Sequence, residues 1–262
     1  MESLIILKIG GNVIDNPPVL ETVLRDFATW QTPRILVHGG GKIANRLMEK
    51  LGIVPKMVEG RRITDRETLD IVTMVYGGLI NKNVVATLQS HSCNAIGLTG
   101  ADANVIPARK RPVKEVDYGF AGDIDVKFIS GEMLDYLLKT GLVPVMAPLT
   151  HDGAGSMLNT NADTIASGVA IALAQTYRVQ LVFCFEKNGV LRDPADDNSV
   201  IDFLDETLFR QYRNEGVITA GMIPKLDNAF AALHSGVAEV RICSPDGLKA
   251  RQLGGTSIQL GV

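Results

Sequence analysis

The chain has 262 residues, of which 46% are hydrophobic and 21% are charged, and its formal net charge is -3. This size and composition are typical of a globular protein with one large α/β domain or two lobes that share a sheet. Acidic and basic residues are mixed along the whole chain, which argues against the basic stripe of a nucleic-acid-binding protein.

Short apolar runs alternate with helical patterns along the chain. The apolar runs cover residues 4–9, 34–37, 95–98, 143–147, 181–185 and 240–243. The helical patterns cover roughly residues 18–30, 41–51, 66–91, 130–140, 162–175, 205–215 and 225–236. Short apolar runs between turn signals suit strands that are buried on both faces. The alternation therefore predicts an α/β fold with a sheet covered by helices on both sides.

Two segments depart from this alternation. Residues 56–63 and 109–128 mix polar and apolar residues with glycine, which predicts hairpins beside the main sheet. An alanine-rich helical pattern ends near residue 175 before a new strand, so we place a lobe boundary there.

Cysteine content and apolar segments bear on the cellular compartment. Cys93, Cys184 and Cys243 are widely spaced and form no CxxC pair, so a disulfide framework or structural zinc site is not expected. The first apolar run is too short for a signal peptide, and no apolar stretch is long enough to cross a bilayer. These features predict a cytoplasmic protein.

Glycine-rich turns follow the first two predicted strands. Gly10 and Gly11 end the first strand, and Gly39, Gly40 and Gly41 end the second. In open α/β sheets, ligands bind beyond the carboxyl ends of the strands, and glycine lets backbone N–H groups approach a phosphate closely. Neither turn matches GxxxxGK[ST] or GxGxxG, so standard P-loop and Rossmann interpretations fail. Tight turns without a ligand remain an alternative, above all for the Gly10-Gly11 pair.

Three basic residues are candidates for contacts with an anion. Lys8 lies inside an apolar strand, where a charge is costly unless it meets an anion. Pro224 suits the first turn of a helix and would place Lys225 there, against the helix dipole. Arg62 follows Gly60 and Arg61 in the first predicted hairpin and suits recognition of a carboxylate. For each residue an ordinary solvated position is the alternative.

A polar run from Asn159 to Asp163 precedes a strongly apolar helix. Asn161 is a plausible N-cap, and Asp163 then falls in the first turn, where the helix dipole favours an acid. Capping does not explain Asn159, so substrate binding is a second interpretation of the segment.

Together these motifs resemble the amino-acid kinase family, and within it the N-acetylglutamate kinases of arginine biosynthesis. The motifs that carry the resemblance, in chain order, are Lys8-Ile-Gly-Gly11, His38-Gly-Gly-Gly41, Gly60-Arg-Arg62 with Ile63-Thr64, Gly97-Leu-Thr-Gly100 with Asp102 and Asn104, Asn159-Thr-Asn-Ala-Asp163, and Gly221-Met-Ile-Pro-Lys225. Each motif is weak alone, but their common order along nearly the whole chain is specific.

The resemblance implies a three-layer αβα sandwich with a mostly parallel open sheet and added hairpins. It implies that residues 1–175 bind an acylglutamate and form a homodimer, and that residues 176–262 bind ATP. Lys8 and Lys225 would stabilise charge on the transferring phosphoryl group, and Asp163 would orient both lysines. The remaining implied contacts are phosphate-binding backbone at Gly10, Gly11, Gly40 and Gly41, substrate contacts at Gly40, Gly41, Arg62, Asn159 and Asn161, and nucleotide contacts at Glu186, Lys187, Asn188, Gly189, Val190, Leu191, Val217, Ile218 and Thr219.

The chain departs from that pattern in three places. Family members commonly carry a Thr/Ser-Asp pair where this chain has Phe185-Glu186, which puts the nucleotide contacts there in doubt. Arginine-inhibited members resemble one another in an N-terminal helical extension, whereas the first predicted strand here begins at once. Their arginine-binding signature is also not evident in residues 247–262. We therefore expect no arginine feedback.

The expected chemistry needs charge stabilisation and no base. A glutamate-type carboxylate, with a pKa of about 4.3, is already ionised at neutral pH. The motifs supply lysines, glycines and amides, and we interpret His38 as structural. We expect Mg²⁺ to be held mainly by the ATP phosphates and water, with no protein metal site.

Other acceptors remain open within the family: carbamate, UMP, aspartate, free glutamate or an aminoadipate derivative. Arg62 and Asn159 favour an N-acyl amino acid, but succinyl could replace acetyl with few sequence changes. A non-catalytic ligand-binding module is the alternative from another class, and it predicts loss of Lys8 or Lys225, both of which are present.

Overall fold

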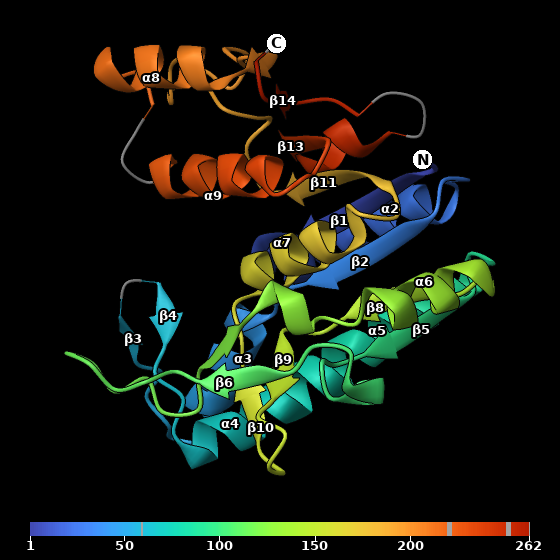
Figure 1. Cartoon of the computed structure of the whole chain (residues 1–262). Helices are drawn as coiled ribbons and strands as arrows, with labels where there is room; N and C mark the ends of the chain where they lie inside the picture. The colour runs from blue at the N-terminus through green and yellow to red at the C-terminus, as the bar shows by residue number, and fades with distance from the viewer. Residues whose placement is uncertain (59, 219–221, 250–252, 262) are drawn as a thin grey trace.

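A mostly parallel sheet of eight strands forms the centre of the computed structural model, which describes residues 1–262 except 59, 219–221, 250–252 and 262 (Figure 1). The strand order is β12-β14-β13-β11-β1-β2-β8-β5. The bounds are β1 Ser3–Ile9, β2 Arg34–His38, β5 Ala95–Leu98, β8 Val143–Met146, β11 Arg178–Cys184, β12 Phe203–Leu204, β13 Glu239–Cys243 and β14 Thr256–Ile258. Every pairing in this sheet is parallel except that of β13 with β14.

Helices cover both faces of the sheet, and each face has its own apolar core. The helices are α1 Gly11–Ile14, α2 Pro17–Ala28, α3 Gly41–Lys50, α4 Arg66–Val72, α5 Asn81–Ser90, α6 Gly131–Lys139, α7 Ala162–Leu173, α8 Glu206–Asn214 and α9 Ile223–His234, with a π-helical segment η1 Thr73–Ile80 and short 3-10 turns η2 Asp102–Asn104, η3 Val126–Phe128 and η4 Pro245–Leu248. Side chains of α6, α7, α8 and α9 pack in one core, and those of α2, α3, α4, η1 and α5 in the other. The predicted three-layer α/β architecture is confirmed.

The central strand β1 shows why the sheet forms in this order. Its sequence Ser-Leu-Ile-Ile-Leu-Lys-Ile is apolar on both faces, and its side chains from Ile6 to Ile9 are buried. It pairs with β11 along seven residues and with β2 along five. The sheet therefore continues without a break across residue 175, and the division into lobes stays a prediction.

Residues 66–90 form one continuous helical run made of α4, η1 and α5. By length and composition alone, this run would pass as a membrane span, which corrects the expectation that no apolar stretch is long enough. Its apolar side chains instead enter a core of the folded chain. Those that are buried are Leu69, Ile71, Val72, Val75, Tyr76, Ile80, Val84 and Leu88. A buried helix in the core of a folded protein can be as long and as apolar as a membrane-spanning helix. The run is therefore weak evidence that the chain crosses a membrane.

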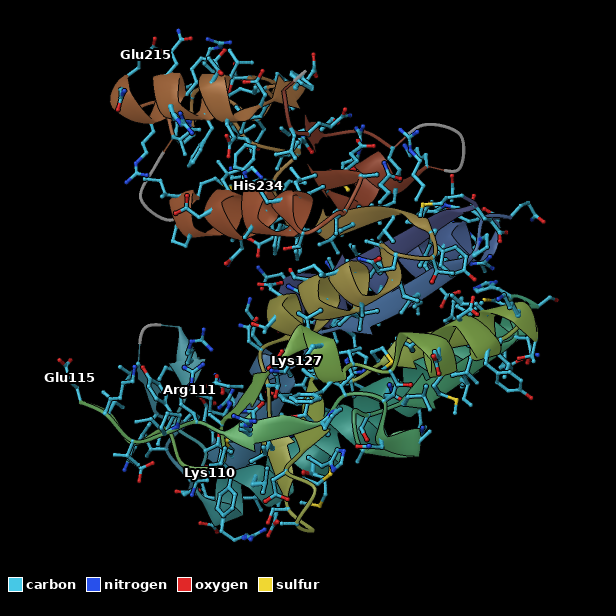
Figure 2. The ribbon with its side chains drawn as sticks, in the orientation of Figure 1. Lys110, Arg111, Glu115, Lys127, Glu215 and His234 are labelled. Atoms are coloured by element: carbon cyan, nitrogen blue, oxygen red, sulfur yellow. The ribbon has the colours of Figure 1, made fainter. Side chains whose placement is uncertain are left out.

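Hairpins lie beside the carboxyl edge of the sheet, as predicted for residues 56–63 and 109–128 (Figure 1). The first consists of β3 Met57–Val58 and β4 Arg61–Arg62, and the second of β6 Ala108–Lys110 and β7 Gly122–Ile124. Figure 2 labels Lys110 and Arg111 on the second hairpin. Arg111 forms an ion pair with Asp123 of β7. A third hairpin, β9 Leu149–His151 with β10 Met157–Asn159, was not predicted, because its strands are short and mix polar with apolar residues.

Candidate active site

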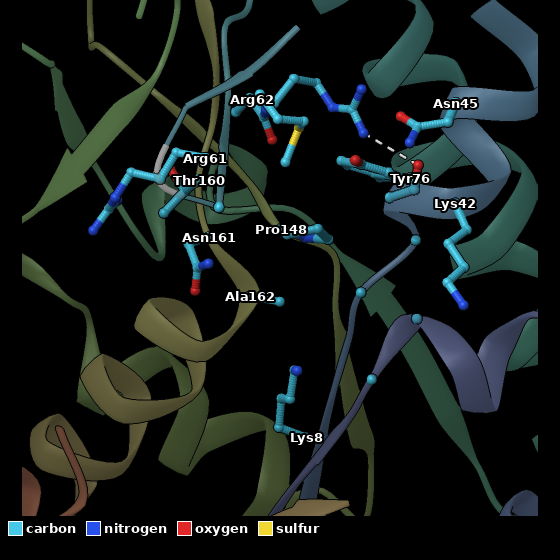
Figure 3. A pocket seen from close by; sticks show the side chains of 18 of the residues that line it. Lys8, Lys42, Asn45, Arg61, Arg62, Tyr76, Pro148, Thr160, Asn161 and Ala162 are labelled. Atoms are coloured by element: carbon cyan, nitrogen blue, oxygen red, sulfur yellow. Dashed lines mark hydrogen bonds between the residues drawn. The ribbon is translucent and has the colours of Figure 1, made fainter. Parts of the chain in front are cut away.

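A cavity of about 430 Å³ opens at the carboxyl ends of the central strands (Figure 3). It lies between the glycine turns, the start of α7, the first hairpin and the end of β11. Its lining includes Lys8, Gly10, Gly11, Gly40, Gly41, Arg62, Tyr76, Asn159, Asn161, Phe185 and Glu186. The fold therefore gathers most of the phosphate and substrate candidates around one space.

The two glycine turns lie against each other at the floor of this cavity. The N–H of Gly39 donates to Ile9, and a Cβ placed on Gly39 would lie 3.6 Å from the Gly11 nitrogen. The turn after β2 leads directly into α3, whose first residues, Gly41 and Lys42, line the cavity. A Cβ at Gly40 would lie 2.4 Å from Cδ1 of Ile80, so any larger residue would clash there unless its neighbours move. Both turns can thus offer backbone N–H groups to a single anion.

The buried lysine of β1 has an anionic partner within the protein. Its ammonium group lies 2.7 Å from Oδ1 of Asp163, and the Lys8 side chain is only 8% exposed. Asp163 reaches this position from the first turn of α7, where Asn161 is the N-cap and accepts hydrogen bonds from the N–H groups of Asp163 and Thr164. The carboxylate compensates the buried charge of Lys8 and fixes its direction.

The second predicted lysine, Lys225, comes from the C-terminal part of the chain. Pro224 lies in the first turn of α9, as predicted, and places Lys225 in that same turn. Its side chain is exposed as a whole, but its ammonium group lies 4.0 Å from the centroid of the Phe185 ring. Loss of water at that end lowers the pKa of Lys225, with Asp163 acting in the opposite direction.

His38 is fully buried beneath the second glycine turn and lies outside the cavity lining. Its Nδ1–H donates to the Gly39 carbonyl at 2.7 Å, and its Nε2 accepts from the Asn81 amide at 3.2 Å. Burial lowers the pKa of His38 to about 4, so the ring is neutral at physiological pH. These contacts support the interpretation of His38 as structural.

Arg62 forms the opposite wall of the cavity, away from Lys8 (Figure 3). It is 7% exposed and donates to the Gly41 carbonyl at 3.1 Å. This hydrogen bond connects the first hairpin to the glycine turn that follows β2. Burial raises the pKa of Tyr76, while the neighbouring Arg62 opposes that rise. Asn159 is held on the same side because its amide donates to Thr64 at 3.0 Å.

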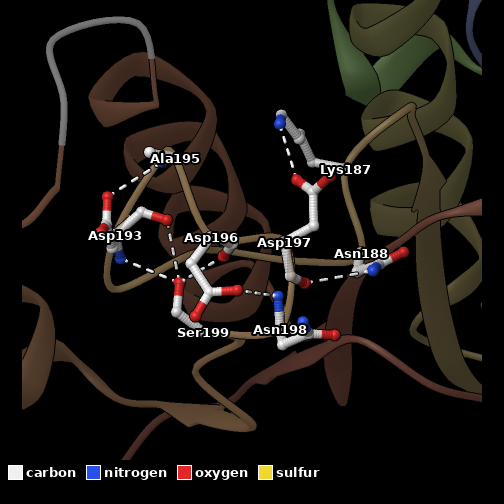
Figure 4. Close-up of polar contacts among 8 residues, drawn as sticks. All are labelled: Lys187, Asn188, Asp193, Ala195, Asp196, Asp197, Asn198 and Ser199. Carbon is white, nitrogen blue, oxygen red and sulfur yellow. Dashed lines mark hydrogen bonds and ion pairs between the residues drawn. The ribbon is translucent and has the colours of Figure 1, made fainter.

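The predicted nucleotide residues lie after β11, and they divide into two groups. Glu186, Lys187 and Asn188 are exposed, and Glu186 lines the cavity. Lys187 pairs with Asp197 at 2.7 Å in a loop that is rich in internal hydrogen bonds (Figure 4). Gly189, Val190, Leu191 and Ile218 are buried, Val217 is partly buried, and Thr219 lies outside the described residues. The side chains of Val190 and Ile218 belong to the core, so only their backbone could reach a nucleotide.

Comparison with known proteins places this geometry in a family. The sequence profile of the amino acid kinase family matches residues 3–244. The chain belongs to the amino acid kinase family. The acetylglutamate kinase of Cytophaga hutchinsonii is 57% identical over 249 residues, which are 95% of this chain and 94% of that protein. That of Bacteroides fragilis is 56% identical over 241 residues, 92% of each chain, and that of Methanopyrus kandleri is 40% identical over 93% of this chain and 96% of that protein.

Solved structures agree with the amino acid kinase fold. The smu.665 protein of Streptococcus mutans superposes with a TM-score of 0.75 at 28% identity and covers 98% of both chains. An N-acetylglutamate synthase of Neisseria gonorrhoeae, complexed with coenzyme A and N-acetyl-glutamate, gives a TM-score of 0.81 at 23% identity. The superposition covers 99% of this chain and 60% of the synthase. At 23% identity, that likeness concerns the fold alone.

Several cavity residues of this amino acid kinase were not predicted. Asn12 and Asn45 line the cavity, and each has a buried amide oxygen without a hydrogen-bond partner. Asn45 lies one helical turn after Gly41, so helical spacing from the glycine turn could have indicated it. Tyr76 comes from η1 and no local sequence signal points to it.

Proposed function

We propose that this chain transfers the γ-phosphoryl group of ATP to the side-chain carboxylate of an N-acylglutamate, with N-acetyl-L-glutamate as the first candidate. The observation that carries the proposal is the 54–57% identity to relatives named acetylglutamate kinase, over 92–98% of this chain. The cavity adds physical support, because it combines cations, backbone N–H groups and a buried arginine in one space. The proposed pathway is arginine biosynthesis.

The reaction we propose joins two anions, so its main demand is electrostatic. The attacking carboxylate is ionised at neutral pH and needs no general base. The lysines Lys8 and Lys225 reduce the repulsion and stabilise charge on the phosphoryl oxygens as it develops. Backbone N–H groups at Gly11, Gly40 and Gly41 would supply fixed donors that need no reorganisation. The N–H of Gly10, which the sequence also suggested, already donates to the Cys184 carbonyl at 3.1 Å.

Asp163 is the orienting group in this proposal. It holds the ammonium group of Lys8 at 2.7 Å and moderates the repulsion between Lys8 and Lys225. Its position in the first turn of α7 is itself fixed by the Asn161 cap. The proposed arrangement is therefore set by helix geometry before any substrate arrives, which lowers the cost of organising the charges.

The acylglutamate would lie between the glycine turns and the first hairpin. Its side-chain carboxylate would face the lysines, and its α-carboxylate would face Arg62. Asn159 and Asn161, with the backbone of Gly40 and Gly41, would contact the acyl amide region. An acyl group on the α-amine has a chemical purpose, because a free amine would attack the acyl phosphate and cyclise.

We propose that residues 1–175 bind the acylglutamate and residues 176–262 bind ATP. The nucleotide would contact the chain at Glu186, Lys187, Asn188, Gly189, Val190, Leu191, Val217, Ile218 and Thr219. Mg²⁺ would be carried mainly by the ATP phosphates and water, where it would neutralise phosphate charge. Among the described residues, Glu186, Asn12 and Asn45 line the cavity and would supply oxygen donors to such an ion.

The assembly and setting of the enzyme are also proposals. We propose a cytoplasmic homodimer without arginine feedback. Met74 and Leu79 are 58% and 52% exposed on the helical run of residues 66–90, and such side chains suit contact with a second copy.

Coupled ADP release with a panel of acceptors tests the proposal. Purified chain and Mg-ATP are combined with N-acetylglutamate, N-succinylglutamate, glutamate, aminoadipate, aspartate, carbamate or UMP. We expect one N-acylglutamate to give the highest kcat/KM by at least about tenfold. Turnover of a different acceptor by well-folded protein would reject the substrate and keep the kinase, and no turnover with any acceptor would reject the proposed activity.

A further inference from the structure

Phe185 lies between Lys8, which lines the cavity, and Lys225, which is not among the cavity-lining residues. It follows β11 directly and its side chain is partly buried. The ammonium group of Lys8 lies 4.8 Å from the centroid of its ring, and that of Lys225 lies 4.0 Å from the same centroid. Both distances are within the range of a cation–π interaction. One aromatic ring is therefore shared by two cations that come from opposite ends of the sequence.

The protein holds this ring in place from several sides. The N–H of Phe185 donates to the Cys243 carbonyl of β13 at 2.8 Å. Its ring stacks on Phe183, with centroids 6.0 Å apart and planes 5° apart, and Phe183 is itself only 6% exposed. A Cβ at Gly10 would lie 3.6 Å from the Phe185 ring, so the first glycine turn packs against it as well. The ring is thus a fixed part of the sheet edge.

An aromatic ring at this position suits two neighbouring cations beside anionic phosphates better than a carboxylate would. The two ammonium groups repel each other, and the incoming phosphates are anionic. A further carboxylate would stabilise the lysines but repel the phosphates, whereas the face of an aromatic ring carries only partial negative charge. Phe185 can therefore hold both cations without adding a full negative charge to the site.

We propose that Phe185 is a positioning residue that holds the ammonium groups of Lys8 and Lys225 toward the transferring phosphoryl group. The inference rests on the proposed kinase function. It assigns a role to the aromatic side chain that follows β11 at the edge of the cavity.

The titration of Lys225 gives an independent signature of this role. The charged groups facing Lys225 are Asp163 on α7, Lys8 on β1 and Glu186 after β11. Leucine at position 185 would keep the apolar surface but remove the π face, so it would destabilise the charged form of Lys225. Activity that needs the ammonium group is lost as pH rises through its pKa, so the alkaline limb of kcat would move to lower pH.

The test compares Phe185→Leu, Phe185→Tyr and the matched control Phe183→Leu with wild type. Phe183→Leu removes the neighbouring ring, which pairs in register with Lys8 across β1 and β11 but has neither ammonium group over its face in the described structure. Steady-state kinetics with Mg-ATP and the preferred acceptor are measured across pH, with thermal unfolding as a check of folding. We expect Phe185→Leu to lower kcat about tenfold to a hundredfold, with KM for the acceptor changed less than about threefold. Its alkaline limb should move down by about half a pH unit.

The other variants make the result specific. Phe185→Tyr keeps the ring and should stay within about threefold of the wild-type kcat, with an unmoved alkaline limb. Phe183→Leu should lower the melting temperature without moving the limb. Equal losses of kcat in Phe183→Leu and Phe185→Leu, or wild-type kcat in Phe185→Leu, would overturn the inference. An inactive wild-type chain would instead reject the proposed function on which the inference rests.

Discussion

Gly40 offers the sharpest test of how the glycine turns are built. In a Gly40→Ala variant, the new Cβ would lie 2.4 Å from Cδ1 of Ile80 and 3.0 Å from the Tyr76 ring. Normal carbon contacts are about 3.5–4.0 Å, so one side must move by about 1 Å or more. Ile80 is 3% exposed and packed in the core, so the turn has to absorb most of that shift.

The expected cost follows from this geometry. Overpacking of this kind destabilises a fold by about 1–3 kcal/mol, and a 1 Å displacement at a reacting centre costs about a hundredfold in rate. We therefore expect Gly40→Ala to lower kcat/KM for the acylglutamate about a hundredfold and to lower the free energy of unfolding by about 1–3 kcal/mol. ADP-release kinetics and urea unfolding measure the two effects.

Two further variants separate the steric cause from a general effect of the substitution. Gly40→Ala/Ile80→Val removes the clashing Cδ1 and should recover at least about tenfold of the lost kcat/KM. Gly78→Ala makes the same substitution in η1 where a Cβ meets nothing within 4 Å, and it should be near wild type. Wild-type kcat/KM in Gly40→Ala, or no recovery in the double variant, would refute the reasoning.

Three other predictions concern the groups around the lysines and the turn. Asp163→Asn keeps the side-chain shape but removes the negative charge that pairs with buried Lys8, so kcat should fall about tenfold to a hundredfold. A kcat within twofold of wild type would contradict the orienting role. The pKa of His38 is lowered to about 4 in the folded state, from 6.5 when unfolded, so its contribution is present above pH 6.5 and lost as pH falls toward 4. Urea unfolding should show a loss of about 3 kcal/mol over that window that is missing in His38→Gln and retained in the exposed control His234→Gln. Asn161→Ala removes two cap hydrogen bonds and should lower the free energy of unfolding by about 1 kcal/mol, whereas Asn161→Asp should not.

The fold was predictable where buried elements have a distinctive sequence pattern. Parallel strands covered on both faces, such as β1 and β11, read as continuous apolar runs, and helices with a strong start signal, such as α7 after Asn161, were placed to within a few residues. β14 was missed because Thr256–Ile258 is short and polar, and its place is decided by pairing with β13.

The site was predictable where a residue is unusual for its local sequence, such as a charged residue within an apolar strand. Lys8 is a charge within an apolar strand, and this alone predicted an anionic partner, which is Asp163 at 2.7 Å. The contacts of Arg62 with Gly41 and of Asn159 with Thr64 join segments 21 and 95 residues apart, and only the folded chain brings them together. No spacing in the sequence indicates that Phe185 would lie under both lysines.

Trapping of the product with hydroxylamine tests the central claim most directly, because an acyl phosphate reacts with hydroxylamine to give a hydroxamate. Wild-type chain with Mg-ATP and the preferred N-acylglutamate should form one hydroxamate for each ADP released. Lys8→Ala should reduce both by at least about a thousandfold, because the buried cation that faces the phosphoryl group is gone. ADP release without hydroxamate, or undiminished hydroxamate formation by Lys8→Ala, would contradict phosphoryl transfer to the carboxylate at this site.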